Sequence, residues 1–124
     1  MTKYKSQGLN RTFRNARKGF NLAVRSEINI RVHVIIAALV IIAAFCLEFT
    51  PIEFCILLFV IALVIVTEML NTAIEFTLDS VYHNRYSRMV GMAKDISAGA
   101  VLFATFTSIV IGLILFGSKL SALF

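Results

Sequence analysis

Acidic and amide side chains interrupt the most apolar part of the sequence at helical spacing. Residues 54–67 carry no charge and a single hydroxyl, and Glu68, Asn71, Glu75 and Asp79 follow them. At about 100° per residue, these four positions fall on one face of a helix. An ionisable side chain near the bilayer centre costs roughly 2.5–3.5 kcal/mol on insertion scales. Because the sequence incurs such a cost twice on one face, we interpret that face as a reaction site rather than as packing.

This group of side chains suits the transfer of a phosphoryl group to a lipid hydroxyl. Mg²⁺ takes a few carboxylate oxygens plus nucleotide phosphates, so Glu27 and Glu75 are candidate metal ligands. Lys94 is a candidate to neutralise charge on the transferred phosphate. Glu68 lies deeper in the apolar run, where a base would take the proton of a hydroxyl that cannot leave the bilayer. Asn71, one turn further on, would hold that carboxylate or the hydroxyl.

Each of these residues also has a purely structural interpretation. Glu68 and Glu75 would then pair with a basic residue of a neighbouring helix. Asn71 would form hydrogen bonds between helices, as polar side chains do inside membranes. Lys94 and Asp95 would be a membrane anchor and a helix cap. The residue types alone leave both interpretations open.

The composition predicts an all-α membrane protein with a single domain over residues 1–124. The chain of 124 residues is 59% hydrophobic, with a mean hydropathy of +0.87, which is too apolar for a soluble domain of this size. Its net charge of +5 comes from basic residues beside apolar runs. That pattern favours an anionic membrane surface over nucleic acid as a partner. Neither a P-loop nor a protein-kinase signature is present, so nucleotide must be held in another way.

The periodicity predicts one N-terminal amphipathic surface helix and three membrane spans. The surface helix covers about residues 9–31, with an apolar stripe facing lipid and basic residues opposite. Glu27 lies on the apolar stripe, either as a capping or snorkelling residue or as a carboxylate aimed at the same site as Glu75. His33 and His83 are expected at the membrane interface without a chemical role. The three spans are predicted over about residues 32–50, 54–78 and 96–118.

The distribution of positive charge predicts the orientation. Eight of the twelve Lys and Arg residues precede the first span, three lie in the predicted polar loop 79–95, and none lies in the connector 48–53. The positive-inside rule therefore puts the N-terminus and the 79–95 loop in the cytoplasm. The acidic face would then meet a lipid headgroup and cytoplasmic solutes at one depth.

These motifs resemble a known family. The stretch Glu68-Met-Leu-Asn71-Thr-Ala-Ile-Glu75 with Asp79 resembles the signature of the prokaryotic diacylglycerol kinases. The resemblance as a whole covers roughly residues 10–118. It is also carried by Ala93-Lys94-Asp95 and by Lys18, Gly19 and Glu27. The resemblance implies a small homotrimeric lipid kinase of the bacterial inner (cytoplasmic) membrane that uses MgATP.

The resemblance also implies roles for single residues. Glu68 would be the general base, and Glu27 and Glu75 would hold Mg²⁺ through ATP. ATP contacts are implied at Asn15, Glu27, Glu75, Tyr86, Lys94 and Asp95. Two positions depart from the family pattern: Asn15 stands where members often carry an aromatic residue, and Ser87 stands where some carry a histidine.

The lipid substrate is expected to contact Glu68, Asn71 and Ala98. Ala98-Gly99-Ala100 and Arg31-Val32-His33 resemble the undecaprenol kinase branch more than the diacylglycerol kinase branch. A small apolar wall also offers few donors to the ester carbonyls of 1,2-diacylglycerol, which lose affinity if left unpaired. Undecaprenol is therefore the favoured substrate, with 1,2-diacylglycerol as the other candidate.

Two other classes of function compete with a lipid kinase. A small proton- or ion-coupled transporter would use Glu68 as the carrier, although such sites tend to lie at the midplane on broken helices. A non-catalytic membrane subunit would use the acidic residues only to pair with a partner. Transfer of labelled phosphate from ATP to a lipid distinguishes the kinase from both.

Overall fold

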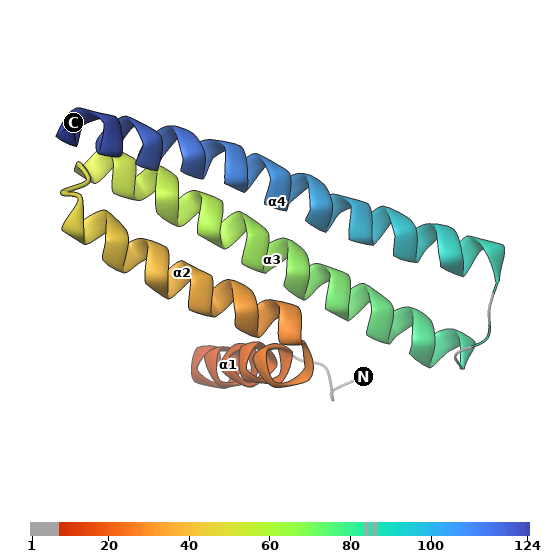
Figure 1. Ribbon diagram of the computed structural model, residues 1–124. Coiled ribbons are helices and arrows are strands. Elements are labelled where there is room, and N and C mark those ends of the chain that lie inside the picture. Colours follow the sequence, from red (N-terminus) through yellow and green to blue (C-terminus); the bar gives the residue numbers. More distant parts are fainter. Residues whose placement is uncertain (1–7, 84, 86) are drawn as a thin grey trace.

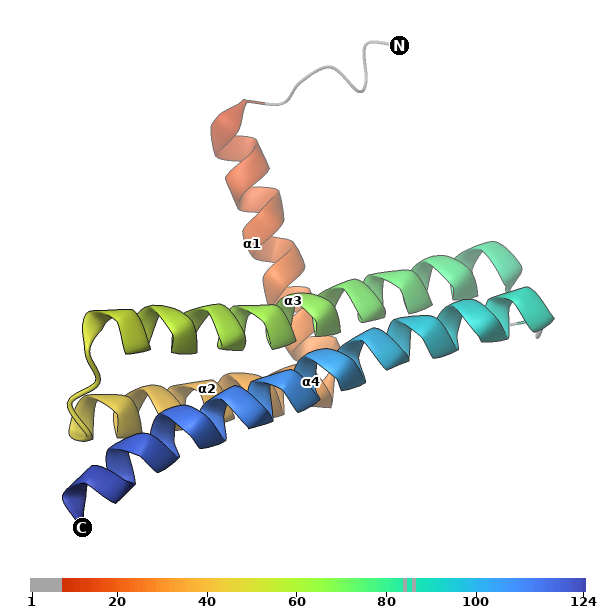
Figure 2. The same ribbon diagram turned by 90° about the horizontal axis from the view of Figure 1, so that it is seen from above.

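The computed structural model describes residues 8–83, 85 and 87–124, and this part of the chain is all-helical, as predicted. It contains α1 (Leu9–Ser26), α2 (Ile28–Cys46), α3 (Pro51–Tyr82) and α4 (Arg88–Leu123). The helices α2, α3 and α4 lie side by side and alternate in direction, whereas α1 runs across them (Figure 1). Figure 2 shows α1 projecting away from the other three. Each of α2, α3 and α4 is long and apolar enough to cross a membrane.

The first predicted helix is shorter than expected, because the chain turns at Glu27. The prediction joined residues 9–31, but α1 ends at Ser26 and Glu27 has an extended backbone (φ −122°, ψ 118°) before α2 begins. Arg31 provides the physical reason. Its Nη1 donates to the carbonyl oxygens of Val24 (3.0 Å) and Arg25 (2.6 Å). A guanidinium that satisfies the last carbonyls of α1 stabilises a helix end without glycine or proline.

The connector between α2 and α3 is tight, as Pro51 predicted. Thr50 caps α3: its Oγ1 accepts from the amide of Glu53 (3.3 Å), and the Glu53 carboxylate accepts from the amide of Thr50 (2.8 Å). Pro51 occupies the first turn, where its missing N–H is not needed. Glu48 reverses the chain with a left-handed backbone (φ 57°).

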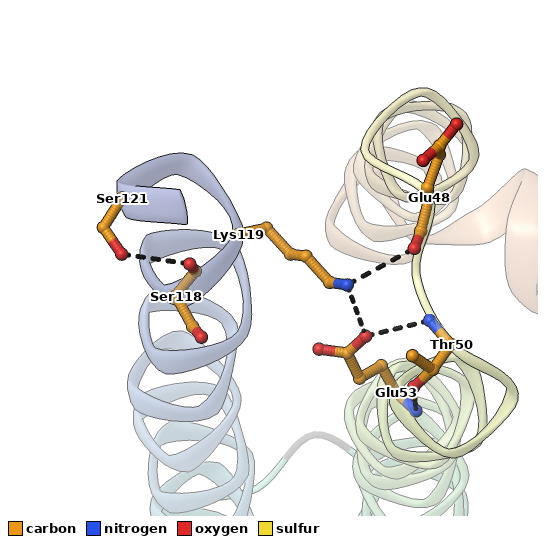
Figure 3. Close-up of polar contacts among 6 residues, drawn as sticks. All are labelled: Glu48, Thr50, Glu53, Ser118, Lys119 and Ser121. Carbon is orange, nitrogen blue, oxygen red and sulfur yellow. Dashed lines mark hydrogen bonds and ion pairs between the residues drawn. The ribbon is translucent and has the colours of Figure 1, made fainter. Parts of the chain in front are cut away.

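An aromatic cluster and one lysine hold α4 against this connector. The Phe49 side chain is buried and its ring lies 4.9 Å from that of Phe116, centroid to centroid. Lys119 Nζ lies 2.9 Å from Glu53 Oε1 and donates to the carbonyl oxygen of Glu48 at 3.3 Å (Figure 3). These contacts fix the register of α4 at the end of the molecule opposite the stretch from Glu68 to Asp79.

The predicted polar loop 79–95 is largely helical. The helix α3 continues to Tyr82 and ends at His83, whose left-handed backbone (φ 50°) caps it, and α4 already begins at Arg88. Ser87 caps α4 by accepting from the amide of Val90 at 3.2 Å. Because α3 has 32 residues and α2 has 19, α3 extends about 20 Å beyond α2 at ~1.5 Å per residue. The α3–α4 hairpin therefore projects past the α1–α2 junction (Figure 1).

Large apolar side chains cover the outside of this bundle. Leu39, Phe59, Leu102, Phe103 and Phe106 are each at least 60% exposed. An apolar surface on three long helices is what lipid or neighbouring membrane helices cover.

Candidate active site

Glu68 is a buried carboxylate in the middle of the bundle. Its residue exposure is 6%, and its Oε1 lies 3.4 Å from Nε2 of His33 on α2. Val64, one turn earlier on α3, and Thr72, one turn later, are buried as well. Glu68 is therefore enclosed within the chain, between α3 neighbours that are buried too and His33 of α2. A carboxylate there is shielded from water, as a base acting on a membrane-held hydroxyl requires.

The next member of the acidic face, Asn71, links α3 to α4. Its Nδ2 donates to Oε1 of Glu75 at 3.3 Å, and its Oδ1 accepts from Oγ of Ser97 at 2.7 Å. Ser97 is buried, whereas Asn71 and Glu75 are half-buried. An asparagine that accepts from one side and donates to the other fixes the orientation of the Glu75 carboxylate.

Lys94 and Asp79 form an ion pair further along the hairpin. Nζ of Lys94 lies 2.7 Å from Oδ1 of Asp79, and both side chains are more than a third exposed. An ammonium has three donors, so two remain for other acceptors. The pair extends the polar row from Glu68 towards the α3–α4 turn.

The four positions predicted on one helix face do share a face, but their partners change along it. Glu68 contacts α2, whereas Asn71 and Asp79 contact α4. The change follows from the different helix lengths, because α2 begins at Ile28, shortly before His33, and the α3–α4 hairpin extends beyond this start (Figure 1). The site therefore runs from a buried end at Glu68 to a partly exposed end at Asp79.

The candidate metal ligands lie on different elements. Glu27 is half-buried at the α1–α2 junction, and Glu75 is half-buried on α3. In the described part of the chain, no group of three or more His, Cys, Asp and Glu side chains is arranged to hold a metal. Mg²⁺ is commonly bound through one or two carboxylates plus substrate phosphates, and each of these half-buried carboxylates has the chemistry for such a role.

The remaining predicted contacts lie on more exposed surface. Asn15, Asp95 and Ala98 are exposed, Asn15 on α1 and the other two on α4. Tyr86 lies outside the described residues. Ala98 follows Ser97 directly, so the predicted small wall begins beside the Asn71 contact but faces outward from this chain.

An apolar pocket of about 420 Å³ adjoins the buried end of the site, between α2, α3 and α4. We call it the α2–α3–α4 pocket. Its lining includes His33, Ala37, Val60, Val64, Ser108 and Gly112. The Ser108 hydroxyl donates to the carbonyl oxygen of Ala104 at 2.8 Å, so it adds little polarity to the walls. The pocket therefore suits a hydrocarbon chain whose end reaches His33, the residue that contacts Glu68.

Sequence reasoning missed two members of this site. His33 was expected at the membrane interface without a chemical role, and Ser97 was not among the predicted site residues. The structure shows why His33 belongs to the site: it lies three residues after Ile30 and four before Ala37, which are both buried, whereas the sequence of α2 is apolar almost throughout and marks no such face. Helical spacing therefore puts its imidazole on the side of α2 that faces α3.

The three long apolar helices and the partly buried acidic face define a helical membrane protein with a polar site. The sequence profile described as "Prokaryotic diacylglycerol kinase" matches residues 14–116, and the chain belongs to this family. It is 36% identical over 115 residues to an undecaprenol kinase of Bacillus subtilis (strain 168), covering 90% of this chain and 93% of the relative. It is 35% identical over 101 residues to a diacylglycerol kinase of Synechocystis sp. (strain PCC 6803). That match covers 82% of this chain but 58% of the relative's length.

Proposed function

We propose that this protein is a lipid kinase that transfers the γ-phosphate of ATP to the hydroxyl of a membrane lipid. The observation that carries the proposal is the position of Glu68. This residue is buried near an apolar pocket, and a row of polar side chains extends from it along α3. A lipid chain in the α2–α3–α4 pocket would bring its hydroxyl to Glu68. The nucleotide would approach from the partly exposed end of the row.

In the proposed reaction, Glu68 accepts the proton of the lipid hydroxyl. The hydroxyl oxygen then forms a bond to the γ-phosphorus of ATP, the bond from that phosphorus to the β–γ bridging oxygen breaks, and ADP leaves. Mg²⁺ bound to the phosphates would neutralise the charge that develops on them. Glu27 and Glu75 would hold this metal, and Asn71 would keep Glu75 oriented.

Lys94 would contribute positive charge beside the phosphates. Its pair with Asp79 supports this role, because the carboxylate fixes the ammonium and leaves further donors for phosphate oxygens. Asn15, Tyr86 and Asp95 are proposed as further ATP contacts on the family resemblance. Ala98 is proposed to contact the lipid.

We favour undecaprenol over 1,2-diacylglycerol as the substrate. The walls of the α2–α3–α4 pocket offer few donors, whereas the two ester carbonyls of diacylglycerol need them. The match to the Bacillus undecaprenol kinase covers nearly the whole of both chains, which also favours this substrate. Turnover of the two lipids side by side in the same micelles decides the question, and a clear advantage for diacylglycerol overturns this preference.

The proposal also covers the oligomeric state and the membrane location of the protein. We propose a homotrimer in the bacterial inner membrane with a cytoplasmic N-terminus, in which α1 lies in the interface. The small residues Ala98, Gly99 and Ala100 are exposed on α4 and would let a neighbouring protomer approach closely. A detergent-corrected mass equal to one chain, in an active preparation, contradicts the trimer.

One assay tests the proposed function against the competing classes. The purified chain in vesicles is mixed with γ-labelled ATP, Mg²⁺ and a bacterial lipid extract, and labelled lipid is measured. A transporter or a non-catalytic subunit produces none. The structure gives the transporter no support, since α3 is one continuous helix from Pro51 to Tyr82.

A further inference from the structure

The imidazole of His33, on α2, lies beside the buried carboxylate of Glu68, on α3. Nε2 of His33 lies 3.4 Å from Oε1 of Glu68. In the part of the chain that the structure describes, no other basic side chain lies within ion-pair distance of this carboxylate. An isolated buried carboxylate is strongly destabilising, so the neighbouring imidazole favours the side-chain orientation in which Oε1 of Glu68 lies beside it.

The position of the imidazole is fixed by packing on α2. Ile30 precedes His33 by three residues and is fully buried, and Ala37 follows it by four residues and is buried too. His33 therefore lies on the buried face of α2, and α2 packs against α3. The side chain of His33 is itself 24% exposed and lines the α2–α3–α4 pocket. His33 therefore touches both the carboxylate and the space proposed for the lipid chain.

The contact distinguishes the two oxygens of Glu68. Oε1 faces Nε2 of His33, which leaves Oε2 as the oxygen that can accept a proton. A base is most effective when a further group orients it, because a shift of 1 Å in a reacting group can lower the rate by about 10²-fold. An imidazole on another helix provides such a restraint, whereas a residue on α3 would move together with Glu68.

We infer that His33 is a positioning residue that holds Glu68 by Oε1 and directs Oε2 towards the hydroxyl of a lipid lying in the pocket. This inference rests on the proposed lipid kinase function. His33 neither accepts the substrate proton nor contacts the phosphates. Its effect is on the fraction of Glu68 side chains in the reactive orientation, and therefore on kcat rather than on the KM for ATP.

Three variants test this role by lipid phosphorylation. His33→Leu removes the imidazole, and we expect kcat to fall ~10–10²-fold with an unchanged KM for ATP. His33→Gln places an amide N–H near the position of Nε2, so it should recover most of the lost rate. His83→Asn is the control. It removes the other imidazole of the chain, at the end of α3, while asparagine tolerates the left-handed backbone there, so kcat should stay at the wild-type value.

The combination with Glu68→Gln separates positioning from a merely structural role. If His33 acts through Glu68, the double variant His33→Leu/Glu68→Gln should be no slower than Glu68→Gln alone. A structural defect would instead multiply the two losses. A direct measurement accompanies the kinetics: the ¹⁵Nε2 chemical shift of His33 should change in Glu68→Gln, whereas that of His83 should not.

The outcomes separate this inference from the proposed function. A wild-type chain that phosphorylates no lipid contradicts the proposed function. A wild-type kcat in His33→Leu, multiplicative losses in the double variant, or an unchanged His33 shift in Glu68→Gln each overturn the inference while leaving the kinase assignment intact.

Discussion

Removal of the Asn71 amide is the perturbation whose effect can be worked out most directly from the structure. Asn71→Ala eliminates the 3.3 Å hydrogen bond to Glu75 and the 2.7 Å bond from Ser97. A hydrogen bond to a charged group contributes about 1.5–3 kcal/mol and a neutral one about 0.5–1.5 kcal/mol. Only the bond to Glu75 touches a proposed metal ligand, so it sets the expected effect on MgATP binding.

A loss of about 1.5–3 kcal/mol corresponds to roughly 10–150-fold in Kd. Glu75 is half-buried, so water can replace part of the lost contact, and we expect a value near the lower end, about 10-fold. Ser97→Ala removes only the neutral bond and leaves the Asn71 donor in place. Because the Ser97 bond reaches Glu75 only through Asn71, its loss should affect Kd less, by roughly 2-fold, the lower end for a neutral hydrogen bond.

The assay is the Kd for ATP as a function of Mg²⁺ concentration, measured together with thermal unfolding to exclude a loss of fold. Asn71→Ala should need more Mg²⁺ than Ser97→Ala, which should need more than the wild type. Wild-type MgATP binding in Asn71→Ala, or a larger effect for Ser97→Ala, refutes the argument that Asn71 orients Glu75.

Three further predictions concern the metal, the pocket and the far end of the bundle. Glu27→Ala and Glu75→Ala should each weaken Mg²⁺-dependent ATP binding, and excess Mg²⁺ should partly restore it; normal Mg²⁺ dependence in both excludes these ligands. Gly112→Leu projects into open space in the α2–α3–α4 pocket and should raise the KM for lipid but not for ATP. Gly117→Leu lies outside the pocket and should change neither KM. Equal effects of the two variants contradict the proposal that the pocket binds the lipid. Lys119→Met should lower the melting temperature slightly, and high salt should reduce the difference; the same difference at every salt concentration argues against a charge contribution.

The membrane helices and the acidic face followed from the sequence because both depend on local spacing. Residues 54–67 are uncharged, so a membrane helix could be predicted there. A period of 3.6 residues then put Glu68, Asn71, Glu75 and Asp79 on one face of that helix. The α1–α2 turn at Glu27 did not follow, because Arg31 caps α1 from seven residues away and neither glycine nor proline marks the end. Tertiary contact, not local propensity, sets this boundary.

The partners of the acidic face were harder to predict than the face itself. His33 and Ser97 reach Glu68 and Asn71 from other helices, so their roles depend on helix register. That register is fixed partly at the opposite end, where Lys119 contacts Glu53. A sequence read one helix at a time carries no such information. The polar residues of the 79–95 stretch suggested a loop, but Ser87 caps a helix that already includes Lys94 and Asp95.

The central claim is that Glu68 accepts the proton of a lipid hydroxyl, and single-turnover transfer from γ-labelled ATP to lipid tests it most directly. Glu68→Gln keeps the size of the side chain but removes the base. The transfer rate should fall by ~10²–10⁴-fold, while the Kd for MgATP, measured on the same preparation, should stay nearly unchanged. A Glu68→Gln variant that transfers phosphate to lipid at close to the wild-type rate contradicts the assignment.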